Sequence, residues 1–251
     1  MISLKTLSLS LLAAVSVAAA ALPQVGCCTF FSGNFQEKTV SLFNGKNLDG
    51  WRAYAKDNAD ASATWSVTPE GTLRATGTPW GYLQTTKSFR DEYTLMVQWR
   101  WAGPALPRDD GTAGVRNSGV FLHKQEKDAI WPQTIEAQLK EGNAGDFYIT
   151  DIETTELRAL RTRALAGVVD EAEREKAQNI RLVRASVLSN ERPVGEWNTY
   201  TIHVSNGTVS LYVNGEYQNK VTGVSVKNGY ICLQSEGAPI EFRNITLWSG
   251  Y

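Results

Sequence analysis

The residues best suited to acid–base chemistry lie in two stretches whose polar and apolar side chains alternate. In the first, residues 117–124, Asn117 and His123 fall on one face, and the apolar Val120 and Leu122 fall on the other. This period of two is typical of a β-strand, whose successive side chains point to opposite faces of a sheet. Because histidine titrates near neutral pH, His123 suits the role of a general base.

The second stretch, residues 135–140, places Glu136 and Gln138 opposite Ile135 and Ala137. If the two strands are neighbours, their polar side chains and an arginine from a third strand form one patch: Asn117, His123, Glu136, Gln138 and Arg100. A carboxylate in such a patch can act as a base when burial raises its pKa. An ordinary solvated sheet face gives the same spacing, so the pattern alone leaves both interpretations open.

Composition excludes several other classes of protein. The chain has 251 residues, and its 25 Lys and Arg against 26 Asp and Glu give a net charge of -1, which argues against a nucleic-acid-binding protein. Three Cys and two His are too few for a multi-cysteine zinc module or a disulfide scaffold. The sequence contains no G-x-S-x-G, H-E-x-x-H, P-loop or G-x-G-x-x-G motif.

Several other stretches alternate with a period of two and predict strands: residues 94–101, 200–204, 209–213, 230–234 and 240–245. Asn206-Gly207 separates two of them, and Asn-Gly tolerates the positive φ values of a tight hairpin turn. Asn214-Gly215 repeats this signal. Many short strands with turn signals between them predict an all-β sandwich or jelly roll.

Residues 151–184 interrupt the strand pattern with a charged segment. Its apolar residues have near-helical spacing, at Leu157, Leu160, Leu165 and Val168. We expect one or two surface helices or an irregular insertion here. The arginines of this segment, Arg158, Arg161 and Arg163, are expected on a solvated face, with an anion-binding lid as the alternative.

The N-terminus has the features of an export signal. Lys5 precedes the apolar run Leu7–Leu22, which is typical of a secretory signal peptide. Cleavage is expected either after Ala21 or at a lipobox ending in Cys27, whose lipidation would anchor the protein to a membrane leaflet. We therefore predict a signal peptide (1–26), a polar tether (27–38) and one domain (39–251), exported to the periplasm or held at the outer membrane as a lipoprotein.

An ordered set of motifs runs from Leu42 to Trp248. It includes Leu-Phe-Asn-Gly-Lys-Asn-Leu-Asp-Gly-Trp at 42–51, Arg-Asn-Ser-Gly-Val-Phe at 116–121, Glu-Ala-Gln at 136–138, Pro-Val-Gly-Glu-Trp-Asn at 193–198 and Leu-Gln-Ser-Glu-Gly-Ala-Pro-Ile-Glu-Phe-Arg-Asn-Ile at 233–245. This set resembles the bacterial 3-keto-disaccharide hydrolase family. The chain departs from the family at Glu236, where many members have His, and the 151–184 segment matches least.

The resemblance implies a concanavalin A-like jelly roll that cleaves 3-keto-glycosides by elimination and adds water to the enol-type product. A ketone at carbon 3 acidifies the proton on carbon 2, so the reaction needs a base, a stabiliser for the enolate and an acid for the leaving oxygen. It does not need the paired nucleophile and acid of an ordinary glycosidase. No organic cofactor is required, and a divalent cation is one candidate for the enolate stabiliser.

The roles that follow from this resemblance are shared among nine residues. We expect Glu136 or His123 as the base, and Glu236 as the acid or as a metal ligand. The remaining candidates would stabilise the enolate (Arg116 or Arg243), bind sugar hydroxyls (Asn117, Gln138 and Gln234) or extend the patch (Arg100). The partner is a glycoside or oligosaccharide substrate. Two alternatives remain, a non-catalytic carbohydrate-binding or laminin-G-like module and a conventional glycoside hydrolase.

Overall fold

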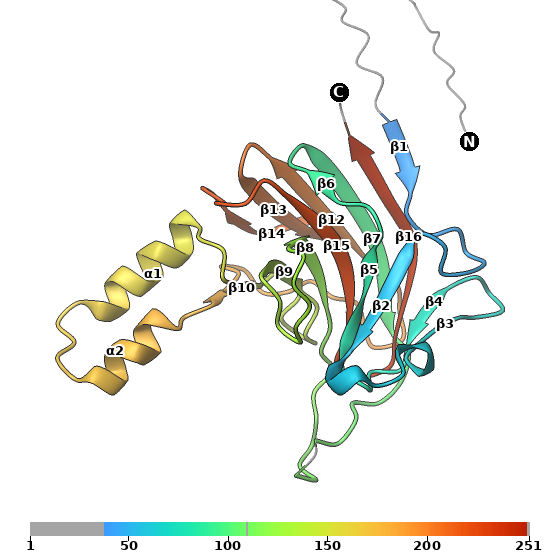
Figure 1. Cartoon of the computed structure of the whole chain (residues 1–251), viewed down its shortest axis with the longest axis horizontal. Helices are drawn as coiled ribbons and strands as arrows, with labels where there is room; N and C mark the ends of the chain where they lie inside the picture. Colours follow the sequence, from blue (N-terminus) through green and yellow to red (C-terminus); the bar gives the residue numbers. More distant parts are fainter. Residues whose placement is uncertain (1–37, 109, 250–251) are drawn as a thin grey trace, which may run out of the picture. The chain divides into compact units, whose positions relative to one another are not determined.

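The computed structural model describes residues 38–108 and 110–249. The predicted signal peptide, the lipidation site at Cys27 and nearly all of the tether lie outside these residues. The described chain forms two eight-stranded sheets that pack face to face, with two helices beside one end of the second sheet (Figure 1). The predicted all-β jelly-roll sandwich with a helical insertion is therefore confirmed.

Sheet 1 has the strand order β14-β13-β12-β7-β16-β4-β3, with β1 paired to β16. Its strands are β1 (Lys38–Ser41), β3 (Trp65–Val67), β4 (Leu73–Ala75), β7 (Tyr93–Trp101), β12 (Asn198–Ser205), β13 (Thr208–Val213), β14 (Glu216–Val221) and β16 (Ile240–Ser249). The two predicted Asn-Gly turns connect β12 to β13 and β13 to β14. Both residues of each turn have positive φ, 47° and 71° at Asn206-Gly207 and 51° and 85° at Asn214-Gly215, as a tight hairpin requires.

Sheet 2 has the order β11-β10-β9-β8-β15-β5-β2, with β6 paired to β15. Its strands are β2 (Trp51–Ala55), β5 (Gly81–Thr85), β6 (Phe89–Arg90), β8 (Gly119–Lys124), β9 (Thr134–Gln138), β10 (Phe147–Thr150), β11 (Leu182–Val183) and β15 (Asn228–Ser235). Two short 3₁₀ helices, η1 (Lys56–Asn58) and η2 (Ala61–Ala63), follow β2. Strands far apart in the sequence are neighbours in both sheets, so each face collects side chains from distant segments.

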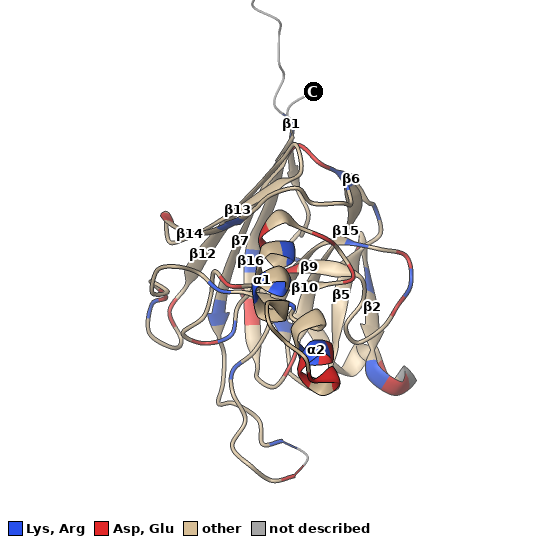
Figure 2. Cartoon of the chain, turned by 90° about the vertical axis from the view of Figure 1, so that its left-hand side faces the viewer, with Lys and Arg blue, Asp and Glu red and all other residues tan. Residues whose placement is uncertain are grey.

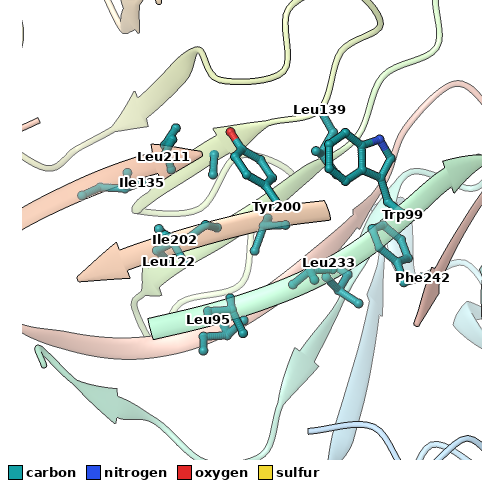
Figure 3. Close-up of a cluster of buried hydrophobic side chains, with 14 of the residues drawn as sticks. Leu95, Trp99, Leu122, Ile135, Leu139, Tyr200, Ile202, Leu211, Leu233 and Phe242 are labelled. Carbon is teal, nitrogen blue, oxygen red and sulfur yellow. The ribbon is translucent and has the colours of Figure 1, made fainter. Parts of the chain in front are cut away.

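The core lies between the sheets and is built from the inward members of the alternating strands (Figure 3). On β7 these are Leu95, Val97, Trp99 and Trp101, all at most 3% exposed, as the period of two predicts. Side chains of sheet 2 meet them from the opposite side. Burial of this much apolar surface, at roughly 25 cal/mol per Å², is the main force that holds the sandwich together.

The charged segment folds into α1 (Thr155–Leu165) and α2 (Glu171–Gln178), which confirms the predicted helical insertion. Thr154 and Asp170 cap the two helices by accepting hydrogen bonds from backbone N–H groups of the first turn. Leu157 is fully buried, whereas Arg158 and Arg163 are exposed. Figure 2 shows charged positions along both helices. Within the described residues, neither helix has the length and apolarity to cross a bilayer.

Candidate active site

The outer face of sheet 2 carries the polar residues predicted from the two alternating stretches. Strands β8 and β9 are antiparallel neighbours, and their register places Glu136 opposite Phe121 and Gln138 opposite Gly119. The strand that follows β8 in the sheet, β15, brings Gln234 to the same face, because its neighbours Leu233 and Ser235 alternate with it. The prediction that the two stretches adjoin is confirmed.

Glu136 is a buried carboxyl group in the middle of this face. Its residue is 4% exposed, and its Oε1 has no hydrogen-bond partner among the described residues. The side chain lies over Gly119 of the neighbouring strand, where an added Cβ would come within 2.6 Å of the Glu136 Cγ. A glycine at this position therefore makes room for the carboxyl group, and no larger residue would.

Burial raises the pKa of Glu136 well above its ordinary value of 4.5, and the charge of nearby Glu236 raises it further. At neutral pH this shift favours the protonated, neutral form. A buried carboxylic acid that keeps its proton can donate it, which is the property expected of a general acid.

Glu236 follows the end of β15 and pairs with Asn117 through an isolated β-bridge. Burial raises the pKa of its carboxyl group, but hydrogen bonds from the Asn117 and Gln234 side chains and the charge of Lys140 act in the opposite direction. Glu236 thus has donors that stabilise its ionised form, whereas Glu136 lacks them. We call these four residues the acid site: Glu136, Glu236, Asn117 and Gln234.

A cavity of about 660 Å³ opens beside the acid site. Asn117 and Glu236 line it directly, together with residues of three loops that precede β5, precede β8 and follow β15. Its lining residues are Gly77, Thr78, Trp80, Leu106, Pro107, Arg108, Asp110, Gly114, Val115, Asn117, Glu236 and Gly237. The volume is in the range of roughly 300–1,000 Å³ that is typical of small-molecule sites.

His123 does not lie on this face, so its predicted position is wrong. Register shifts between β8 and β15, because Lys124 pairs with Tyr230 and Phe121 pairs with Cys232, leaving two residues of β8 opposite one of β15. Such a bulge reverses the facing of the side chains beyond it. His123, at a φ of 53°, stacks at 6.4 Å on Tyr93 of sheet 1, and burial lowers its pKa.

Arg100 and Arg243 lie on the outer face of sheet 1, on the opposite side of the sandwich from Glu136. They alternate with the core residues Trp99 and Phe242, so they point away from the core. The guanidinium groups of Arg100 and Arg243 lie 4.7 Å and 4.0 Å from the ring centroid of Trp197. The prediction that they share one pocket with Glu136 is therefore wrong. Alternation along a strand shows which of its residues share a face, but it does not show to which sheet the strand belongs.

Arg116 and Gln138 are occupied by structural contacts. Arg116 donates to the Gly103 carbonyl oxygen at 2.9 Å and pairs with Glu141 at 2.9 Å. The Gln138 side-chain oxygen accepts hydrogen bonds from the backbone N–H groups of Leu139 and Lys140. Both residues hold the loops around the acid site, and neither lines the cavity.

Only Asn117 and Glu236 among the twelve lining residues were found from the sequence, and Trp80 and Arg108 are among those that were not. Trp80 and Arg108 lie in loops rich in Gly and Pro, where no alternation indicates which side chains meet. Arg108 is the cation among the lining residues. The sequence did indicate a loop here, because residues 103–114 contain several Gly and Pro residues, which are typical of a loop that packs closely against other segments.

At the other end of the same face, the bulge turns Lys124 outward into a fully paired cluster. The Lys124 side chain is fully buried, and its Nζ lies 2.6 Å from Asp128. Asp128 also accepts hydrogen bonds from Arg52 and from the Tyr82 hydroxyl, and the Arg52 guanidinium is the main cause of its lowered pKa. This cluster anchors the loop between β8 and β9.

Among the described residues, no group of three or more His, Cys, Asp and Glu side chains is placed to hold a metal ion. The acid site offers a different set of donors. Its side-chain oxygens Glu136 Oε1, Asn117 Oδ1 and Gln234 Oε1 are buried and lack hydrogen-bond partners within the described part of the chain. Carboxylate and amide oxygens are the ligands that Mg²⁺ and Ca²⁺ prefer, so these residues fit a hard divalent cation.

The fold and the acid site define a jelly-roll β-sandwich with two carboxyl groups of raised pKa beside a cavity. The model of the 3-keto-alpha-glucoside-1,2-lyase-like domain matches residues 38–247, and the chain belongs to this family. A 3-keto-disaccharide hydrolase of Bacteroides thetaiotaomicron is 27% identical to the chain over 179 residues. These residues are 70% of this chain and 56% of that relative, so the chain matches little more than half of the relative's length.

Solved structures share the fold. A protein provisionally named a glycosyl hydrolase, from Parabacteroides distasonis, superposes with a TM-score of 0.55 at 17% identity, covering 84% of this chain and 93% of that one. The carbohydrate-binding module CBM66 of Bacillus subtilis gives a TM-score of 0.51 at 12% identity, covering 80% of this chain and 96% of that one. At 17% and 12% identity, these likenesses show a shared fold, and a shared fold does not by itself define function.

Proposed function

We propose that this protein cleaves 3-keto-glycosides by removing the proton on carbon 2 and eliminating the aglycone from carbon 1. The observation that carries the proposal is the acid site. The pKa values of two carboxyl groups, the buried Glu136 and the partly buried Glu236, are raised, and Glu236 lines a cavity of about 660 Å³. Perturbed carboxyl groups beside a cavity are typical of acid–base catalysis, and family membership supports this substrate class.

Glu236 is the base in this proposal. It lines the cavity, and the amide groups that hydrogen-bond to it favour the ionised form that a base needs. Its carboxylate takes the proton from carbon 2, and the electron pair of that C–H bond forms the enolate with the carbon 3 ketone. This reverses the roles expected from the sequence, because hydrogen bonds favour the ionised form of Glu236, whereas burial favours the protonated form of Glu136.

Glu136 is the proposed acid. The raised pKa favours the protonated form of its carboxyl group, and the proton passes to the departing oxygen as the bond from carbon 1 to that oxygen breaks. The enolate electrons then form the double bond between carbons 1 and 2 and restore the ketone. Water can add to this enone in a second step, which would make the net reaction a hydrolysis.

Charge on the enolate oxygen needs a partner. Arg108 is the cationic residue that lines the cavity and is our candidate for this role. A divalent cation held by the acid-site oxygens would polarise the ketone when bound, but it would bind the ionised form of Glu136 and so exclude that residue from the acid role. Addition of MgCl₂, CaCl₂ or MnCl₂ to EDTA-treated protein, followed by calorimetry and thermal unfolding, would test for such a cation independently of turnover.

The decisive experiment compares three substrates that differ in oxidation and in reactivity. The purified domain is incubated with methyl β-glucoside, with its 3-keto derivative and with the 3-keto derivative of a disaccharide, and release of the aglycone is followed. Cleavage of the 3-keto compounds alone supports the proposal. Cleavage of the plain glucoside would indicate a conventional hydrolase, and binding without turnover would indicate a carbohydrate-binding module.

We also propose export with lipidation at Cys27, on the strength of the Lys5 n-region and the apolar run that follows it. Labelling of expressing bacteria with an alkyne-tagged palmitate should mark the protein and should fail for Cys27→Ser. Release of unlabelled protein that begins at Leu22 would instead place cleavage after Ala21.

A further inference from the structure

The cavity beside the acid site has an apolar wall formed by Trp80, Leu106, Pro107 and Val115. Trp80 is 37% exposed and Val115 is 41% exposed, although both are large hydrophobic residues. Exposed apolar side chains that gather in one cavity differ from the scattered ones that every protein surface carries, and they are typical of a binding site.

Hydrogen bonds between loops hold this wall in place. The backbone N–H of Leu106 donates to the Gly237 carbonyl oxygen at 2.7 Å, and the N–H of Gly237 donates to the Gly77 carbonyl oxygen at 2.8 Å. A Cβ on Gly77 would come within 2.5 Å of the Ala238 backbone, so the approach of these loops requires glycine there. The turn that carries Glu236 is thus fixed to both loops of the wall.

The loop that carries Leu106 and Val115 is itself closed on a second contact. Gly114 lies against the Leu106 carbonyl oxygen, and a side chain at that position would collide with it. The turn at its tip is closed by two backbone hydrogen bonds: the N–H of Arg108 donates to the Thr112 carbonyl oxygen at 3.0 Å, and the N–H of Gly111 donates to the Arg108 carbonyl oxygen at 2.9 Å. The wall is therefore preformed, and little ordering is needed when a ligand binds.

We propose that this wall binds an apolar aglycone, and that Trp80 determines the preference of the enzyme for such leaving groups. The inference rests on the proposed function, in which Glu236 and Asn117 act on the keto sugar at the polar end of the cavity. The aglycone then extends toward Trp80. A second sugar would contact only the indole face of Trp80. An apolar aglycone would also bury Leu106, Pro107 and Val115, and the removal of their apolar surface from water would strengthen binding.

The test uses three 3-keto-glucosides whose alcohol leaving groups are similar in acidity but differ in apolar surface, with methyl, benzyl and cyclohexylmethyl aglycones. We expect KM for the cyclohexylmethyl and benzyl compounds to be at least about tenfold lower than KM for the methyl compound, which corresponds to about 1.4 kcal/mol. In Trp80→Ala this ratio should fall to about one, and in Trp80→Leu it should remain intermediate, because leucine restores part of the apolar surface.

Trp131→Ala is the matched control, since Trp131 is a 53% exposed tryptophan that does not line the cavity. This variant should keep the wild-type ratio. Circular dichroism and thermal unfolding of each variant establish that the comparison is made on folded protein. Equal KM values for all three compounds in the wild type, or an unchanged ratio in Trp80→Ala, would overturn the inference while turnover itself upholds the proposed function. Turnover of none of the 3-keto compounds would overturn both.

Discussion

The two outer faces of the sandwich both carry charged side chains that alternate with core residues, yet they differ in how those charges are compensated. On sheet 1, Glu241 accepts hydrogen bonds from Arg100 at 2.7 Å and 2.9 Å and from Arg74 at 3.2 Å. We call Arg74, Arg100, Arg243, Glu241 and Trp197 the guanidinium cluster. On sheet 2, Glu136 is equally buried but has no ion-pair or hydrogen-bond partner for Oε1 among the described residues.

The difference separates a face that stabilises from a face that can react. Glu241 is 5% exposed and fully compensated, and such a carboxylate contributes to the fold. An uncompensated buried carboxyl group costs free energy and shifts its pKa, and proteins retain such groups mainly at functional sites. The period of two along the strands is the same on both faces, so only the partners reveal the distinction.

The largest loss of turnover is expected for a substitution of Glu236. Glu236→Gln should reduce aglycone release from a 3-keto-glycoside by about 10²–10⁴-fold, the usual contribution of a general base. Glu241→Gln, the same change on the other face, should leave the rate close to wild type but lower stability by about 1–2 kcal/mol, because its two arginine partners are more than a third exposed. Similar turnover in the two variants would abolish the distinction between the faces.

Glu136→Gln should show whether the neutral carboxyl group is the proton donor. We expect turnover of methyl 3-keto-glucoside to fall by about 10²-fold, within the range for a general acid. The loss should be much smaller for the 4-nitrophenyl compound, because nitrophenolate leaves without protonation. Equal losses for both leaving groups would remove Glu136 from the acid role and leave it as a positioning residue for Glu236.

Gly119→Ala probes the space that Glu136 needs. The added methyl group would lie within 2.6 Å of the Glu136 Cγ, and the carboxyl group must move. We expect turnover to fall by about tenfold, since small displacements of catalytic groups are costly. The double variant Gly119→Ala/Glu136→Gln should be no slower than Glu136→Gln alone, and additive losses would show that Gly119 acts elsewhere.

The stability of the fold should depend on pH through Glu136. The pKa of Glu136 is raised in the folded state, so its ionisation favours the unfolded chain, and wild-type stability is lost as pH rises from about 4.5 through the folded-state pKa. Glu136→Gln should therefore match the wild type near pH 4 and exceed it by about 1–3 kcal/mol at alkaline pH, measured by urea unfolding. A constant difference across this range would contradict the raised pKa.

The same shifts predict a bell-shaped dependence of turnover on pH. Glu236 must be ionised, and its raised pKa places the acidic limb above 4.5, whereas loss of the Glu136 proton gives the alkaline limb. With the 4-nitrophenyl compound, whose leaving group needs no proton, the alkaline limb should be absent in both the wild type and Glu136→Gln. An alkaline limb that remains with this compound would belong to another group.

The smallest effect is expected at Arg243. Its guanidinium group stacks on Trp197 and donates to Gln98 at 2.9 Å, on the face opposite the acid site. Arg243→Gln should cost about 0.5–1 kcal/mol of stability, the value of an exposed cation–π contact, and should change turnover less than twofold. A large loss of turnover in folded Arg243→Gln protein would mean that the two faces are coupled.

The amino-acid sequence by itself determined the strands, the turns and the insertion. Alternation along β7 set its inward residues, Asn-Gly pairs set two hairpins through their positive φ values, and a helical period set α1. These are local properties, because they depend on the alternation of polar and apolar side chains and on backbone sterics. They do not depend on how the strands are arranged in the sheets. The pairing of β8 with β9 agrees with the general tendency of strands that are close in sequence to pair.

Only the tertiary structure decided which candidates meet. Arg243 and Gln234 belong to consecutive strands, β16 and β15, which lie in opposite sheets, and no local period distinguishes the two sheets. One extra residue in β8 turned His123 into the core and Lys124 outward, because a bulge forms where a distant strand sets the register. The partners that set the pKa values of Glu136 and Glu236 come from β15 and from the segment before β8, so the chemistry of the acid site depends on contacts that a one-dimensional pattern does not contain.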